Sequence, residues 1–167
     1  TTMDPIEMSK ILTNIKKKNI NNVIMEASSH GLKQNRLDGL KFKTGIFTNL
    51  SHDHLDYHKT IKDYLKSKLY LFENLLKKRA NVITDNSIPE FKKIKNIALK
   101  NKFNLQTIFN NKSNLKLLSH EYHNDKQIIK IRYKKVIYKF KVNLIGKIQL
   151  KNIFMATLAI TSLPSLV

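Results

Sequence analysis

The 167-residue sequence contains no cysteine and no tryptophan, and it has only four glycines and three prolines. The lack of cysteine excludes disulfide bonds and thiolate metal sites, and it fits a reducing compartment. The few glycines form no G-x-x-x-x-G-K-[ST] phosphate loop. No apolar run approaches the ~20 residues of a membrane span, and no signal-peptide pattern opens the chain. These absences predict a soluble, cytoplasmic protein with no membrane partner.

Acidic residues are also scarce: 12 of them face 31 lysines and arginines, which gives a net charge of +19. Such an excess ordinarily indicates a polyanionic partner. Arginine, however, occurs only at Arg36, Arg79 and Arg132, although its forked side chain is the usual reader of phosphate and guanine. We therefore interpret the charge mainly as lysine-rich solvated surface, and nucleic acid stays an unfavoured alternative partner.

The first two thirds of the chain alternate helix and strand signals. Asp4 followed by proline is typical of a helix start, and the short apolar runs that follow are typical of buried strands. A Ser87-to-Glu90 spacing indicates a capping box at a further helix. The expected helices cover residues 5–18, residues 60–77 and a segment opening at Ser87; the expected strands are residues 23–25, 45–50, 80–84 and 105–109.

The last third changes character. Residues 115–118, 127–133 and 136–142 alternate apolar and polar side chains around a short turn, which predicts an antiparallel hairpin or meander. A final helix is expected from about residue 150 to Pro164. The predicted fold is therefore α/β: a mostly parallel sheet flanked by helices, with the antiparallel element in the second half, and no linker divides the chain.

Three of the six histidines lie between residues 52 and 58, directly after an expected strand. Ligands bind beyond strand C-termini in parallel sheets. We therefore expect three features to lie close together at this edge: the histidine window, Glu26 with residues 28–31, and Lys68. The window is close to a zinc-hydrolase motif, but Tyr57 interrupts the required Asp-His pair. No G-x-S-x-G elbow supports a nucleophilic serine at residues 28–29. Polar loop histidines remain an alternative interpretation.

The order of residues in these segments indicates a protein family more specifically than their composition does. Met-Glu-Ala-Ser-Ser-His-Gly-Leu begins at residue 25, Asp-His-Leu-Asp-Tyr-His begins at residue 53, and Tyr64 precedes Lys68 by one helical turn. In this order the strings closely resemble the central domain of the Mur ligases, in particular the MurE type. The resemblance runs from the Thr-Thr pair at the start to Asn152 and so covers nearly the whole chain. It implies a P-loop-type α/β domain.

The resemblance also implies a reaction and a set of roles. The reaction is ATP-dependent addition of meso-diaminopimelate or L-lysine to UDP-MurNAc-L-Ala-D-Glu through an acyl phosphate, with Mg2+. The implied metal and catalytic residues are Glu26, His54 and Lys68, the last as a carbamate. The implied substrate-binding residues are Thr1, Thr2, Ser28, Gln34 and Arg36, with Asn152 near the ATP base.

Physical chemistry is consistent with several of these roles. Magnesium prefers oxygen ligands, so Glu26 suits it, and a carbamate would make Lys68 an oxygen ligand instead of a repelling ammonium. The alternative for Lys68 is a lysine whose stem covers the core. Arg36 suits a carboxylate or phosphate. The other window histidines are assigned to loop chemistry, and Gly31 to a turn.

Because no phosphate loop is present, we expect residues 1–167 to be a partial central domain, inactive without the phosphate loop, the UDP-binding domain and the C-terminal domain. Residues 146–149 depart from the family pattern, which puts the nucleotide-facing end in doubt. Two alternatives stay open. One is another Mur or folylpolyglutamate ligase, and the other is a basic nucleic-acid-binding domain.

Overall fold

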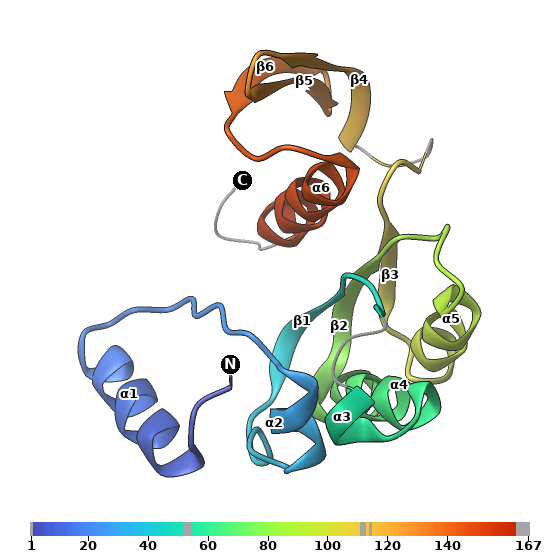
Figure 1. The fold of residues 1–167 in the computed structure, drawn as a ribbon. Coiled ribbons are helices and arrows are strands. Elements are labelled where there is room, and N and C mark those ends of the chain that lie inside the picture. Colours follow the sequence, from blue (N-terminus) through green and yellow to red (C-terminus); the bar gives the residue numbers. More distant parts are fainter. Residues whose placement is uncertain (1, 52–54, 111–112, 114, 163–167) are drawn as a thin grey trace. The chain divides into compact units, whose positions relative to one another are not determined.

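The computed structural model describes residues 2–51, 55–110, 113 and 115–162 (Figure 1). Contacts between Cα atoms divide the chain into two compact units. The first unit comprises Thr1–Phe42 and Leu50–Lys77, and the second comprises Lys43–Asn49 and Lys78–Val167. Within the described ranges, no helix is long and apolar enough to cross a membrane.

The first unit is helical. The Asp4 carboxylate accepts a hydrogen bond from the Ile6 N–H at 2.9 Å, and proline occupies the first helical position, so the predicted helix start is confirmed. The second predicted helix begins after its cap, Thr60, but its α-helical part ends early and continues as a π-helical turn. The helices are α1 (Pro5–Lys17), α2 (Ser29–Lys33), α3 (Leu55–His58), α4 (Ile61–Tyr70) and the π-helix η1 (Leu71–Leu75).

The predicted strand at residues 23–25 is wrong. This segment has no regular secondary structure, and Val23 and Ile24 are 45% and 91% exposed. A strand needs a neighbour that takes up its backbone hydrogen bonds, and no strand among the described residues pairs with it. An apolar run indicates a preference for burial, but it does not reveal whether a pairing partner exists.

The second unit contains a three-stranded sheet in the order β1-β2-β3. The β2 and β3 strands are parallel, with Thr84 opposite Thr107, and α5 connects them. The Thr84 hydroxyl donates to the Phe47 carbonyl at 3.0 Å, which ties together the ends of β2 and β1. Three predicted strands are thus confirmed with shifted ends. The elements are β1 (Phe42–Phe47), β2 (Leu76–Thr84), α5 (Phe91–Lys100) and β3 (Asn104–Thr107).

The predicted capping box at Ser87 is wrong. Glu90 occupies the N-cap of α5, and no side chain caps that helix. The Ser87 N–H instead donates to the Asp85 carboxylate at 2.8 Å. Aspartate side chains readily bond the backbone two residues on, and this local turn moves the helix start beyond Pro89.

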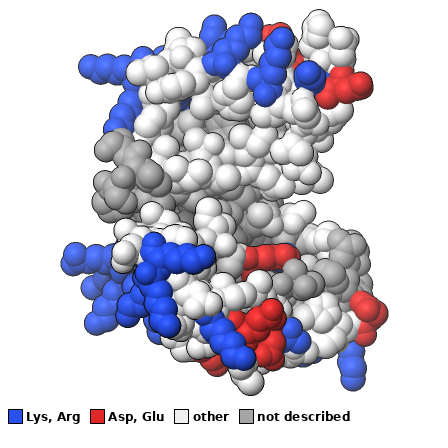
Figure 2. Space-filling view, turned by 90° about the vertical axis from the view of Figure 1, so that its left-hand side faces the viewer, with Lys and Arg blue, Asp and Glu red and all other residues white. Residues whose placement is uncertain are grey.

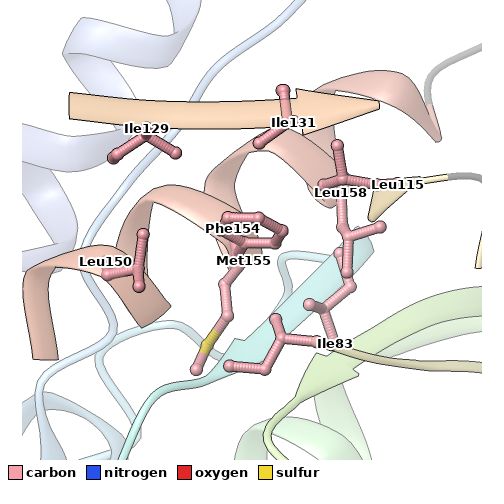
Figure 3. Packing of buried hydrophobic residues seen from close by; sticks show 9 residues of the cluster. Ile83, Leu115, Ile129, Ile131, Leu150, Phe154, Met155 and Leu158 are labelled. Atoms are coloured by element: carbon pink, nitrogen blue, oxygen red, sulfur yellow. The ribbon is translucent and has the colours of Figure 1, made fainter. Parts of the chain in front are cut away.

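The second sheet of the same unit is the predicted meander, and α6 packs on one of its faces (Figure 1). Alternate residues of β5, including Ile129 and Ile131, point toward Phe154 and Leu158 of α6 (Figure 3). Ile83 of β2 joins the same core, so both sheets of the unit share one apolar interior. The elements are β4 (Leu115–His123), β5 (Lys126–Tyr133), β6 (Val136–Val142) and α6 (Lys147–Thr161).

The other face of the meander is strongly basic. The strand register sets Lys130 directly opposite Lys139, and Lys116 directly opposite Arg132. Lysine and arginine side chains gather along the upper part of the surface in Figure 2, which β4–β6 form. Like charges directly opposite each other destabilise a sheet, so this face opposes the stability of the meander.

Lys139→Glu is therefore expected to raise the free energy of unfolding by about 0.5 kcal/mol, because it turns a like-charge pair into an attractive one. Urea denaturation at low and high salt measures the change, and salt should shrink it. The control is Lys93→Glu on the exposed face of α5, which lowers the net charge equally without a cross-strand partner. An equal gain in both variants would show that net charge alone matters.

Candidate functional site

The buried Thr2 is the centre of a hydrogen-bonded cluster in the first unit. Its hydroxyl donates to the Glu26 carbonyl at 3.1 Å and accepts from the Ser28 N–H at 2.8 Å. The Ser28 hydroxyl lies 3.0 Å from the Thr2 hydroxyl. The Arg36 guanidinium donates to the Thr2 carbonyl at 3.0 Å. The structure thus brings together four of the predicted site residues.

Ser28 also sets the start of α2. Its hydroxyl accepts from the Gly31 N–H at 3.2 Å as the helix N-cap. Gly31 is therefore a helical residue, and the prediction that it lies in a turn is wrong. A Cβ at Gly31 would lie 2.5 Å from the Thr2 Cβ. The position excludes any side chain because the chain near Thr2 runs so close to α2.

His58, the last residue of α3, is completely buried. Its Nε2 lies 2.9 Å from the Ser29 hydroxyl. Its ring stacks on Tyr64 with a centroid distance of 5.0 Å and an interplanar angle of 18°. The assignment of this histidine to loop chemistry is therefore wrong. No periodic signal marks it, because its partners lie in two other helical segments.

Lys68 lies on α4 and is half-buried. Its Nζ lies 5.0 Å from the centroid of the Tyr64 ring. Contacts therefore run from Lys68 through Tyr64 and His58 to Ser29, whose neighbour Ser28 belongs to the Thr2 cluster. The segment after residue 25, the end of the histidine window and Lys68 belong to one contact network.

The predicted substrate-binding residue Gln34 belongs to a more exposed group around Tyr57. Its side-chain amide donates to the Tyr57 hydroxyl at 3.1 Å. The Tyr57 ring also lies 3.9 Å from the His30 ring centroid and 4.8 Å from the Lys33 Nζ. This group joins the surface of α2 to α3.

The remaining predicted site groups are Thr1, His54, Asn152 and the side chain of Glu26. Thr1 and His54 lie outside the described residues. Asn152 lies on α6 of the second unit and is half-buried. Glu26 is exposed, and within the described ranges no three His, Cys, Asp or Glu side chains cluster as metal ligands. Among the described members of the predicted metal set, only the Glu26 carboxylate offers magnesium an oxygen as it stands. A carbamate on Lys68 would add oxygens of the kind that this ion prefers.

An ion pair missed by sequence reasoning ties the start of α6 to the end of β2. The Lys151 Nζ lies 2.6 Å from the Asp85 carboxylate, whose side chain is only 2% exposed, against 38% for Lys151. Burial by itself would raise the pKa of Asp85. Hydrogen bonds from Lys151 and Ser87, with the lysine charge, outweigh burial and lower this pKa below its ordinary value.

Lys151→Met is expected to lower the free energy of unfolding by about 1 kcal/mol at pH 7, because the buried Asp85 carboxylate loses its cation. The effect is small because solvent screens the charge of the half-exposed lysine. The folded pKa of Asp85 is depressed, so the pair's contribution is complete above the unfolded pKa and is lost as pH falls through the folded one. Urea denaturation should show the full difference at pH 7 and less and less of it as the pH falls below the ordinary pKa of an aspartate carboxyl. Lys147→Met, at an exposed position of α6, is the control and should change stability little at either pH.

A separate pocket of about 420 Å³ lies in the second unit. Amide and hydroxyl side chains line much of it, including Asn81, Asn104, Gln106 and Ser162. Two of these amides already bond each other, at 2.8 Å between Asn104 and Asn81. None of the predicted site residues lines this pocket. We therefore do not assign the pocket to the catalytic site.

The fold and the motif residues define a ligase-type α/β domain, and family comparison identifies it. The Mur ligase middle domain model matches residues 1–160. The chain therefore belongs to the Mur ligase middle-domain family.

Individual relatives point to one branch of this family. The chain is 37% identical over 167 residues to a UDP-N-acetylmuramoyl-L-alanyl-D-glutamate–2,6-diaminopimelate ligase of Chelativorans sp., covering 99% of the chain and 35% of the relative. It is 35% identical over 156 residues to the ligase of that name from Agrobacterium fabrum, covering 93% of the chain and 32% of the relative. The chain thus spans about a third of the length of these relatives.

Solved structures agree with this placement. A structure of a UDP-N-acetylmuramoyl-L-alanyl-D-glutamate–2,6-diaminopimelate ligase superposes with a TM-score of 0.77 at 25% identity, covering 95% of this chain and 33% of that one. The MurF ligase of Thermotoga maritima in complex with ADP matches with a TM-score of 0.59 at 14% identity, covering 81% of this chain and 30% of that one. The second likeness shows the fold alone.

Proposed function

We propose that this chain is the middle domain of an ATP-dependent ligase of peptidoglycan precursor synthesis. The ligase adds a diamino acid, meso-diaminopimelate or L-lysine, to UDP-MurNAc-L-Ala-D-Glu. The names of the relatives support the substrate class. The observation that carries the proposal is the cluster of Thr2, Ser28 and Arg36, because it gathers the residues that the family resemblance assigns to this substrate.

The chemistry of that cluster suits an anionic substrate. A guanidinium has five N–H donors, so the bond from Arg36 to the Thr2 carbonyl leaves donors for a carboxylate or phosphate. The hydroxyl groups of Thr2 and Ser28 bond each other and the neighbouring backbone, so they hold the segment beside this guanidinium in place. We assign Thr1 and Gln34 to the same substrate. These groups orient the glutamate carboxylate for attack on the γ-phosphate of ATP, and such positioning accounts for much of the catalysis.

We assign Glu26, His54 and Lys68 to magnesium and Asn152 to the ATP base. The neutral amine of Lys68 adds to carbon dioxide and releases a proton, which leaves a carbamate with two oxygens. Bound magnesium would neutralise phosphate charge during transfer. Tyr64 supports the Lys68 side chain from one side.

We further propose that the phosphate loop, the UDP-binding domain and the C-terminal domain belong to the longer ligase, and that the ligase works in the cytoplasm, where ATP is available. The relatives are about three times as long as the segment they share with this chain. This sequence has no G-x-x-x-x-G-K-[ST] string. Such a loop holds the phosphates of ATP with its backbone N–H groups and its lysine.

Phosphate release tests this function. The complete ligase is expected to release phosphate only when ATP, magnesium, UDP-MurNAc-L-Ala-D-Glu and one diamino acid are all present, and the 167-residue chain alone should release none above background. Offering diaminopimelate and lysine in separate reactions identifies the amino acid. Folate with glutamate serves as the control for a folylpolyglutamate-type ligase. Turnover with that pair alone, or turnover by the chain alone, would contradict the proposal.

A further inference from the structure

We propose that His58 is a positioning residue that holds the substrate-binding end of α2 and the Lys68-bearing helix α4 in a fixed relation. The inference rests on the proposed ligase function and adds a residue to its machinery. His58 itself touches neither substrate nor metal in this assignment. It acts through Ser29 on one side and through Tyr64 on the other.

The burial of His58 shows that it fills a specific place. Its side chain is 0% exposed, and burying a polar imidazole is unfavourable unless it is hydrogen-bonded. The Ser29 hydroxyl, itself 4% exposed, lies 2.9 Å from the His58 Nε2. A leucine would fill such a space without this requirement, so the contact with Ser29 is the feature that an imidazole adds.

The ring makes these two contacts with different parts, and it also lies near the rings of Tyr57 and His30, at centroid distances of 5.0 and 5.4 Å. Its edge bonds Ser29, which lies 29 residues earlier in the chain. Its face stacks on Tyr64 at 5.0 Å. The edge contact restrains α2 along the ring plane, and the face contact restrains α4 perpendicular to it. One rigid side chain thus restrains both helices.

Each partner adjoins a group with an assigned role. Ser29 directly follows Ser28, whose hydroxyl contacts Thr2 and caps α2. Tyr64 carries the Lys68 Nζ at 5.0 Å from its ring. A shift of about 1 Å in reacting groups can slow a reaction a hundredfold. Loss of the His58 contact is therefore expected to disturb the distance between substrate and Lys68.

Two variants remove the hydrogen bond from opposite sides. His58→Phe keeps an aromatic ring for Tyr64 but lacks the nitrogen, and Ser29→Ala removes only the hydroxyl group. Each is made alone and together in the complete ligase, and kcat, KM and the free energy of unfolding are measured. Leu75→Ala is the matched control, because Leu75 is a 3% exposed apolar residue of the same unit with no assigned role at the site.

We expect kcat to fall about 10- to 100-fold in each single variant. This range is typical of residues that do not touch the reacting groups but orient the residues that do. The double variant should lose little more, because both changes remove the same hydrogen bond. The KM for ATP should stay within about twofold. Leu75→Ala should reduce stability and leave kcat within about twofold. His58→Gln, which replaces the nitrogen but not the ring, should recover part of the loss.

Several results would overturn the inference. They are an unchanged kcat in folded Ser29→Ala, losses that multiply in the double variant, or an equal fall in kcat in the Leu75→Ala control. Ser29→Ala decides the matter if His58→Phe does not fold. The wild type is assayed first: absence of turnover there refutes the ligase function and this inference with it, whereas an active wild type with unaffected variants refutes the inference alone.

Discussion

Lys68→Ala in the complete ligase is expected to lower kcat by at least about a thousandfold, which corresponds to about 4 kcal/mol of lost transition-state stabilisation. In the proposed site this side chain supplies the carbamate oxygens, and alanine removes them together with their charge. The fold should survive, because Lys68 is only half-buried on α4. Phosphate release and a denaturation curve measure the two effects separately.

Chemical rescue makes the Lys68 result specific. A short carboxylic acid, such as acetate or formate, can enter the space left by the lysine and offer two oxygens, so added acid should restore part of the turnover. Lys66→Ala is the matched control, since Lys66 is an exposed lysine of the same helix and should keep full activity. Unchanged turnover in a folded Lys68→Ala protein would rule out the carbamate role.

Gly31→Ala is expected to lower the free energy of unfolding by about 2 kcal/mol, the middle of the range for overpacking a closed site. The new methyl carbon would lie 2.5 Å from the Thr2 Cβ and 2.6 Å from its hydroxyl oxygen. Thr2 would have to move, and its bonds to Glu26 and Ser28 would be lost. Substrate binding should weaken at the same time, since both Thr2 and Ser28 are assigned to the substrate.

The sign of the Gly31 effect is the informative part. In an unconstrained helix, replacing glycine by alanine stabilises by about 1 kcal/mol, so helix propensity alone predicts the opposite result. Asn96→Ala, on the exposed face of α5, is the control and should stabilise slightly. Urea denaturation measures both variants, and titration calorimetry of the complete ligase measures the substrate affinity. A stability gain at Gly31 would contradict the close approach of Thr2.

Local signals in the sequence were sufficient for much of the fold. Asp4 before proline marked the start of α1 because capping involves only neighbouring residues. The alternation of apolar and polar residues at 127–133 predicted β5, because successive side chains of a strand point to opposite faces of the sheet. The motif strings likewise predicted the family, which comparison over residues 1–160 establishes.

Predictions failed where a distant segment decides the local structure. Residues 23–25 carry a strand-like apolar run, but no described strand pairs with them. Gly31 was assigned to a turn, whereas its reason is the approach of Thr2. Neither the missing strand partner nor the approach of Thr2 is visible in the local pattern. The Ser87 prediction failed for a local reason instead, because the Asp85 carboxylate, two residues earlier, accepts the Ser87 N–H.

The sequence by itself determined the family, the order of most helices and strands, and which residue types are available for ligase chemistry. These properties follow from the order of residues in the motifs and from short-range periodicity. Only the tertiary structure decided how those residues are held. The enclosure of His58 between Ser29 and Tyr64 and the pairing of Asp85 with Lys151 depend on contacts between segments far apart in the chain. Burial and hydrogen bonding across such distances are set by how the chain folds back on itself, and no local spacing encodes them.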